Sequence, residues 1–226
     1  MALVAQRAEN HWVGVNCGIM DQMISAAGVE NHALLIDCRS LQTTPVRLPP
    51  GSVVVVMDTA TRRGLVESAY NERRAQCEAA AEFFGVLKLR DVGTKRFESL
   101  ADQLPDVIRR RAAHVIFENA RVLSAARMMR TGNAATLGKL LSASHSSLRD
   151  LFQVSSPELN MMVEIARKEP ACYGARMTGA GFGGCAVALV RAAGRLADAA
   201  QRLTNGKNEG CWSSDSAKAV VFAAEH

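Results

Sequence analysis

The sequence is poor in aromatic residues, since only 5% of its 226 positions are Phe, Trp or Tyr. Proteins that bind single-stranded nucleic acid stack bases on aromatic side chains, so this scarcity disfavours such a platform. The net charge of +5, from 27 Lys and Arg against 22 Asp and Glu, is too small to indicate nucleic acid without a concentrated basic patch. It suits an anionic small-molecule partner or a mildly basic surface. We therefore expect no nucleic-acid partner.

Long apolar runs and paired cysteine motifs are also missing. No stretch approaches the roughly 20 uncharged apolar residues of a membrane-spanning helix, so we expect no membrane partner. The N-terminal MALVAQR lacks the apolar core of a signal peptide. The six cysteines include no Cys-x-x-Cys pair, and the five histidines do not cluster with them. This favours free thiols in a reducing cytoplasm, and we expect no metal ligands.

The sequence does contain enough apolar material for a core, with 48% hydrophobic residues. Periodicity, caps and turn signals predict helices over 2–13, 19–27, 67–84, 106–130, 133–152, from 157 onward and over 194–203. Strands are predicted over 32–37, 43–48, 53–57, 185–190 and 219–223. The β-branched run 53–57 predicts a strand buried on both faces. Because strands and helices do not alternate along the chain, the fold class is α+β.

Three segments could carry chemistry, and the first is the run GVNCGIMDQ over 14–22. Asp21 would lie one turn into a helix, near the positive end of the helix dipole and the free N–H groups around Gly18. A carboxylate there stays ionised, and it can accept a proton from a hydroxyl or orient that hydroxyl. An ordinary acidic residue in a first helical turn explains the same spacing, so both interpretations stay open.

The second segment is the glycine-rich run GARMTGAGFGG over 174–184, which contains Gly-x-Gly-x-x-Gly at Gly179, Gly181 and Gly184. A dinucleotide-binding fingerprint needs a strand before this motif and a helix after it. Here a strand-forming run follows, which argues against that fingerprint. Glycines at this density either let a backbone approach a ligand closely or form a tight hairpin turn, and the residues alone do not decide between the two.

The third segment is the helix predicted over 67–84. One stripe of this helix, at spacings i, i+4, i+7, i+11 and i+14, holds Tyr70, Arg74, Cys77, Ala81 and Phe84. A tyrosine at the start of a helix can pack its ring and offer its hydroxyl to a ligand. A core tyrosine with an arginine neighbour is the alternative.

In this order and spacing, the three segments resemble the galactokinases, a family within the GHMP small-molecule kinases. The family's catalytic-aspartate segment is similar to CGIMDQ over 17–22, its sugar-side tyrosine helix to YNERRAQCE over 70–78, and the third GHMP motif to TGAGFGGC over 178–185. The resemblance covers residues 2–192. It implies a remnant of the GHMP N-terminal domain over 1–50 and a GHMP kinase C-terminal domain over 51–226.

The resemblance further implies a cytoplasmic enzyme that uses ATP and Mg²⁺ to phosphorylate galactose, giving galactose 1-phosphate. Asp21 would activate or orient the anomeric hydroxyl. Gly18 would offer its backbone N–H to the sugar, and Tyr70 would contact a sugar hydroxyl. Backbone donors suit a negatively charged transition state, so the loop near the transferred phosphoryl group would comprise Gly179, Ala180, Gly181, Phe182 and Gly183.

Two family motifs do not occur in the 226 residues: the sugar-binding GEHTDY signature and the PxGxGLSSS loop that holds the nucleotide phosphates. We therefore expect this chain alone to be inactive or nearly so, since phosphoryl transfer depends on positioning and charge neutralisation. Three alternatives stay open: a kinase for N-acetylgalactosamine or arabinose, a non-catalytic sugar-binding or sensor module, and a half-enzyme completed by a partner chain.

The apolar residues of the first predicted helices also bear on partners. These helices hold Trp12, Met20, Met23 and Ile24. In a complete GHMP kinase such residues would pack on the N-terminal domain. We expect them either to pack on a missing N-terminal half or to promote self-association, because exposed apolar patches favour association.

Overall fold

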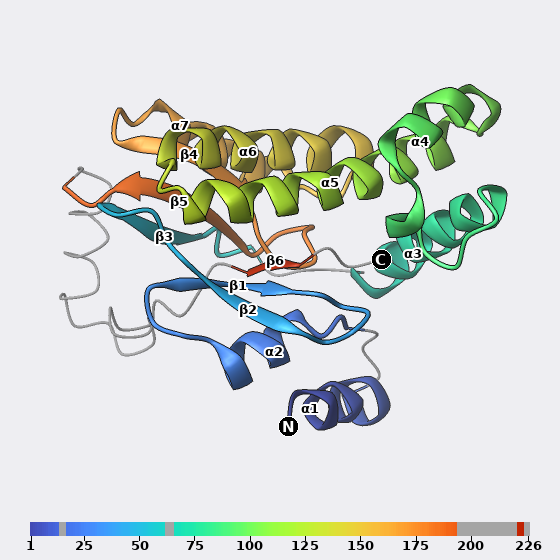
Figure 1. Cartoon of the computed structure of the whole chain (residues 1–226), viewed down its shortest axis with the longest axis horizontal. Helices are drawn as coiled ribbons and strands as arrows, with labels where there is room; N and C mark the ends of the chain where they lie inside the picture. The colour runs from blue at the N-terminus through green and yellow to red at the C-terminus, as the bar shows by residue number, and fades with distance from the viewer. Residues whose placement is uncertain (14–16, 62–65, 194–220, 224–226) are drawn as a thin grey trace.

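The computed structural model describes residues 1–13, 17–61, 66–193 and 221–223 (Figure 1). The helix predicted over 194–203, the segment 204–218 and the start of the last predicted strand lie outside these residues. The α-helices of the described part are α1 (Ala2–Ala8), α2 (Met20–Ala27), α3 (Val66–Phe83), α4 (Thr94–Leu100), α5 (Asp106–Arg130), α6 (Ala134–Ser147) and α7 (Pro157–Lys168). Short 3₁₀ or π turns are η1 (Glu9–Val13), η2 (Leu89–Asp91), η3 (Ala101–Gln103) and η4 (Leu148–Phe152). No helix among these residues is long and apolar enough to cross a membrane.

The strands of the described part form two three-stranded sheets. One has the order β2-β1-β6 and the other the order β3-β5-β4. The strands are β1 (His32–Ile36), β2 (Thr43–Arg47), β3 (Ser52–Asp58), β4 (Cys172–Met177), β5 (Cys185–Arg191) and β6 (Val221–Ala223). All pairs are antiparallel except β1 with β6. The fold is α+β, as predicted, with the C-terminal helices on one side of the molecule and α1 and α2 on the other (Figure 1).

Helix α7 shows how closely local signals determine this part of the fold. The Ser156 side chain accepts a hydrogen bond from the backbone N–H of Leu159, and Pro157 occupies the first turn. Ser at the N-cap and Pro at the first helical position are favoured for these reasons. Leu159, Val163 and Ala166 then form the buried stripe that packs on β4 and β5.

The predicted burial of strand 53–57 on both faces is wrong. Val55 is buried, but Val56 is 65% exposed. Within the described residues β3 pairs only with β5, so it is an edge strand of its sheet. Val54, on the same face as Val56, packs against the core formed with α5 and α6, whereas Val56 lies beyond that cover.

Helix α6 and strand β4 approach each other unusually closely. A Cβ built on Gly138 would lie 2.1 Å from the carbonyl oxygen of Tyr173, and one built on Gly174 would lie 1.9 Å from the carbonyl oxygen of Gly138. Side chains at either position would therefore collide with backbone. The absence of two Cβ atoms lets α6 lie directly against β4, next to the glycine-rich segment 178–184.

Candidate functional site

A cavity of about 350 Å³ opens where four parts of the chain meet. One wall comes from α1 and the residues before α2, a second from α3, and the rest from the segments that follow β1 and α3. The lining residues include Gln6, Asn10, Cys17, Gly18, Ile19, Cys38, Arg39, Tyr70, Arg74, Cys77, Glu78, Ala81, Leu87, Lys88, Leu89 and Arg90. Segments far apart in the sequence thus share one ligand-sized space.

Helix α3 supplies the wall that the sequence stripe predicted. Tyr70, Arg74, Cys77 and Ala81 all line the cavity. Cys77 and Ala81 are also buried, and Phe84 at the end of the stripe is 1% exposed in the core. The stripe therefore faces the cavity at its start and the core at its end, because the helix passes from the cavity into the core. Contact of Tyr70 with a ligand stays a prediction.

The structure brings together two of the predicted sugar contacts and leaves a third apart. Gly18 and Tyr70 line the same cavity. Asp21 lies in the first turn of α2, as expected, but its side chain is exposed and it is not among the lining residues. The proposed role of Asp21 in catalysis stays a prediction.

Side chains of α1 and η1 hold the chain just before Gly18. The Cys17 backbone N–H donates to Asn10 Oδ1 at 3.1 Å, and the Cys17 carbonyl accepts from Gln6 Nε2 at 3.2 Å. Burial and the neighbouring Glu9 carboxylate raise the pKa of the Cys17 thiol. Sequence reasoning missed Gln6 and Asn10, because nothing in their spacing distinguishes them from other polar residues of a surface helix.

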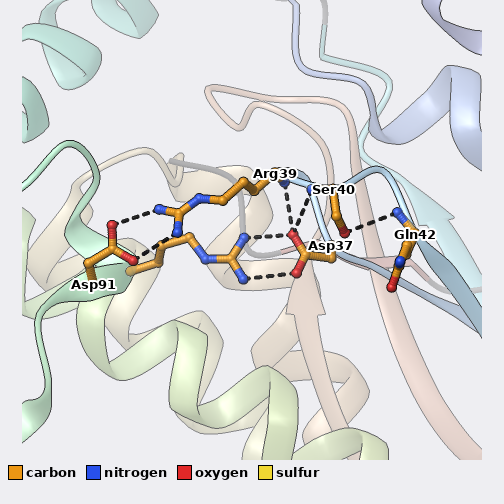
Figure 2. A network of polar contacts seen from close by, with 6 residues as sticks. Asp37, Arg39, Ser40, Gln42 and Asp91 are labelled. Atoms are coloured by element: carbon orange, nitrogen blue, oxygen red, sulfur yellow. Dashed lines mark hydrogen bonds and ion pairs between the residues drawn. The ribbon is translucent and has the colours of Figure 1, made fainter.

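The opposite wall is fixed by two crossed ion pairs between the segment after β1 and η2 (Figure 2). Arg90 donates to both oxygens of Asp37, at 2.7 and 3.1 Å. Arg39 donates to both oxygens of Asp91, at 3.0 and 2.7 Å. Fork-shaped contacts of this kind add geometric specificity to the electrostatic attraction. They tie together two segments more than 50 residues apart in the sequence.

These ion pairs matter more for the position of the two arginine side chains than for the free energy of unfolding. The Arg90 guanidinium, with the backbone N–H groups of Arg39 and Ser40, holds the pKa of Asp37 well below its usual range. Exposed ion pairs typically contribute only about 0–1 kcal/mol. Their effect here is to hold the Arg39 and Arg90 side chains in place, beside Lys88 on the same wall. The guanidinium N–H groups that these pairs leave over can donate to a polar ligand.

The glycine-rich segment 178–184 joins β4 to β5 and closes an antiparallel hairpin. The Thr178 N–H donates to the Cys185 carbonyl at 2.9 Å. Positive φ angles occur at Gly179, Gly181, Phe182, Gly183 and Gly184, conformations that glycine adopts most easily. The hairpin alternative is therefore confirmed. None of these residues lines the cavity, so the predicted phosphate-proximal role of 179–183 stays a prediction.

Packing explains at least one of these glycines. A Cβ built on Gly181 would lie 2.0 Å from the carbonyl oxygen of Val154. The same carbonyl accepts a hydrogen bond from the Phe182 N–H at 2.7 Å. The centre of the loop thus rests on the backbone between η4 and α7.

His145 on α6 holds the start of this loop. Its Nδ1 accepts a hydrogen bond from the Met177 N–H at 3.2 Å, at the last residue of β4. An acceptor at Nδ1 requires the neutral ring. Burial, with a smaller contribution from Arg149, lowers the pKa of His145 from 6.5 to about 4. The charges of Arg167 on α7 and Arg176 on β4 also lower this pKa, whereas a hydrogen bond with the Asn160 side chain opposes the shift.

Acid is therefore expected to weaken the fold through His145. Between pH 6.5 and 4 the unfolded chain binds this proton and the folded chain does not, so the stability falls as the pH falls through this window. Allowing for solvent screening, we expect a loss of about 1–2 kcal/mol between pH 7 and 5. Urea unfolding at both pH values measures it. His145→Asn keeps an acceptor but cannot titrate, so it should show a smaller loss; equal losses would contradict the assignment.

The described residues contain no group of three or more His, Cys, Asp or Glu side chains that could hold a metal ion.

Comparison with known proteins agrees with this fold. Residues 123–207 match the family model described as GHMP kinases C terminal. This segment is therefore similar to the C-terminal domain of the GHMP kinases, in agreement with the α+β fold.

The chain is also similar to a galactokinase of known structure. The crystal structure of Lactococcus lactis galactokinase complexed with galactose matches it with a TM-score of 0.82 at 35% identity. The match covers 89% of this chain and 53% of that one, so this chain spans about half the length of that galactokinase. The structure of L. major mevalonate kinase in complex with R-mevalonate matches with a TM-score of 0.46 at 22% identity, over 74% of this chain and 41% of that chain.

Proposed function

We propose that this chain provides the sugar-side half of a galactokinase active site, in a cytoplasmic enzyme that phosphorylates galactose with ATP. The observation that carries the proposal is the shared cavity of Gly18 and Tyr70, two residues expected to contact the sugar. The similarity to a galactokinase solved with galactose supports the choice of sugar. N-acetylgalactosamine and arabinose remain alternative substrates of the same site.

The role proposed for each residue follows from the hydrogen bonds or protons that its groups can donate or accept. The Gly18 N–H and the Tyr70 hydroxyl would bind sugar oxygens, and the wall at Arg39 and Arg90 would orient the polar ligand. Asp21 would accept or orient the proton of the anomeric hydroxyl. The backbone N–H groups of 179–183 would lie near the transferred phosphoryl group, where negative charge develops. ATP supplies that group when it is bound.

We further propose a domain boundary at residues 50 and 51. The turn 49–51 separates β2 from β3, and these strands belong to different sheets. Residues 1–50 would then belong to the GHMP N-terminal domain and 51–226 to the C-terminal domain. Strand β6 returns from the C-terminal part to pair with β1, which would keep the two parts in contact.

A second candidate is a sugar-binding or sensor module without catalysis. It is favoured by the placement of Asp21 and of 179–183 outside the lining of the cavity. The two candidates share the sugar site and differ in whether a complete phosphoryl-transfer centre can form around it.

Calorimetry with galactose tests the shared site. The chain is expected to bind galactose, and Tyr70→Phe should weaken binding about 2- to 13-fold, the equivalent of one hydrogen bond of roughly 0.5–1.5 kcal/mol. Tyr173→Phe changes the sequence's other tyrosine, which packs in the core beside α6, and should leave affinity unchanged. Equal effects of both variants, or no binding of galactose, N-acetylgalactosamine or arabinose, would refute the site.

ATP is expected to bind weakly in the same experiment, with a Kd of about 1 mM or above, which corresponds to a binding free energy of about 4 kcal/mol or less.

A further inference from the structure

An arginine of the cavity-lining helix α3 donates hydrogen bonds to the backbone at the junction of η4 and α7. Arg73 of α3 donates through Nε to the Phe152 carbonyl at 2.8 Å and through Nη2 to the Gln153 carbonyl at 3.3 Å. On its own helix Arg73 also contacts Glu72 and Gln76. Arg73 lies three residues after Tyr70, so the helix that carries the proposed sugar contact is tied directly to this backbone.

The same backbone holds the glycine-rich loop from its other side. The next carbonyl, that of Val154, accepts the Phe182 N–H at 2.7 Å, and Gly181 lies against it with no room for a Cβ. An unbroken series of contacts therefore runs from α3 through Arg73 and residues 152–154 to the centre of the loop 178–184.

We propose that residues 152–154 form a positioning bridge, which sets the glycine-rich loop relative to the helix that carries Tyr70, and that Arg73 is its positioning residue. The proposal rests on the proposed function in one respect: the loop and Tyr70 would serve the phosphoryl and sugar ends of one site. The rate of phosphoryl transfer depends on the distance between the loop and the helix that carries Tyr70, because small misplacements of reacting groups lower the rate by large factors.

The bridge contains two locally unfavourable features, a left-handed backbone conformation and a buried guanidinium beside it. Gln153 has a φ of 58°, a left-handed conformation that is unfavourable for a residue other than glycine. Arg111 is 3% exposed and donates to Gln76 Oε1, Gln153 Oε1 and the Leu151 carbonyl, with no carboxylate among these partners. Burial lowers the pKa of Arg111 to about 10. Strained and desolvated groups of this kind persist where surrounding contacts fix them, often beside functional sites.

Residue-resolved amide exchange of the whole chain, followed by NMR at pH 7, tests the bridge. Arg73→Met should speed exchange at the Phe182 amide about tenfold or more, because Val154 loses its support. Arg73→Lys, which can still donate to one carbonyl, should have a smaller effect. The matched control is Arg74→Met: Arg74 pairs with Glu78 on its own helix, so Phe182 exchange should stay within about twofold.

Two results would overturn the proposal. One is unchanged Phe182 exchange in Arg73→Met. The other is a uniform acceleration at all amides, which would make Arg73 a general stabilising residue; urea unfolding of each variant separates that case. Adding galactose provides a further readout, since binding beside Tyr70 should slow Phe182 exchange in the parent chain and not in Arg73→Met. If galactose does not bind at all, the proposed function fails, whereas the ligand-free exchange rates still decide the bridge.

Discussion

Gly174→Ala is expected to destabilise the chain by about 4 kcal/mol or more, a large share of the roughly 5–15 kcal/mol that typically stabilises a domain. The new Cβ would lie 1.9 Å from the Gly138 carbonyl oxygen and 2.8 Å from the Gly138 Cα. Both are backbone atoms of α6, so no side-chain rotation relieves the clash. Relief would require α6 to move away from β4, which would open the core between them and remove the His145 contact with Met177.

Urea unfolding of the variants measures this effect. Gly93→Ala is the matched control, because no atom lies within 4 Å of a Cβ built there and its φ of −70° is open to alanine. As Gly93 is an N-cap residue, its replacement should cost less than about 1 kcal/mol. If Gly174→Ala were as mild as Gly93→Ala, the close packing of α6 on β4 would not exist in solution.

The elements that local signals define could be predicted from the sequence. Helix α5 runs over Asp106–Arg130, the range given by apolar periodicity, and the Asn133 side chain caps α6 by accepting from the Thr136 N–H at 2.9 Å. The stripe on α3 also placed Tyr70 and Arg74 on one face, which turned out to line a cavity. In each case the determining interactions lie within a few residues of one another.

The features that depend on distant packing could not be predicted. Strand β4 was not foreseen, since Gly174 in its interior disfavours a strand and is explained only by the approach of α6. The pairing of Asp37 with Arg90 joins two positions 53 residues apart, and no spacing rule selects those two among the chain's many charges. The edge position of β3 likewise depends on which strands neighbour it, which its own β-branched residues do not specify.

The largest functional effect is expected for Asp21→Asn in a fused chain. The fusion joins to this chain the part of the Lactococcus lactis galactokinase that lies outside the match, which covers 53% of that protein. Asp21 follows the cavity-lining residues Gly18 and Ile19 and occupies the first turn of α2. Asparagine is nearly isosteric and is tolerated in a first helical turn, so the fold should survive while the carboxylate is lost.

The expected loss falls on kcat rather than on the KM for the sugar. A general base is typically worth about 10²–10⁴-fold in rate, or roughly 3–5 kcal/mol of barrier. Its charge matters most in the transition state, when the anomeric hydroxyl gives up its proton, so ground-state binding should change little. Tyr70→Phe should behave in the opposite way, by raising KM through one lost hydrogen bond and leaving kcat nearly intact.

Asp106→Asn supplies the matched control for charge in a first helical turn. Asp106 is an exposed acidic residue at the start of α5, paired with Arg109 and Arg110. Removing its charge weakens only exposed ion pairs and a helix-dipole interaction, which together are worth about 1 kcal/mol of stability. Steady-state kinetics of both variants in the fused chain give the answer. If Asp21→Asn left kcat within a few-fold of Asp106→Asn, then Asp21 would also be an ordinary first-turn acid and the anomeric proton would need another acceptor.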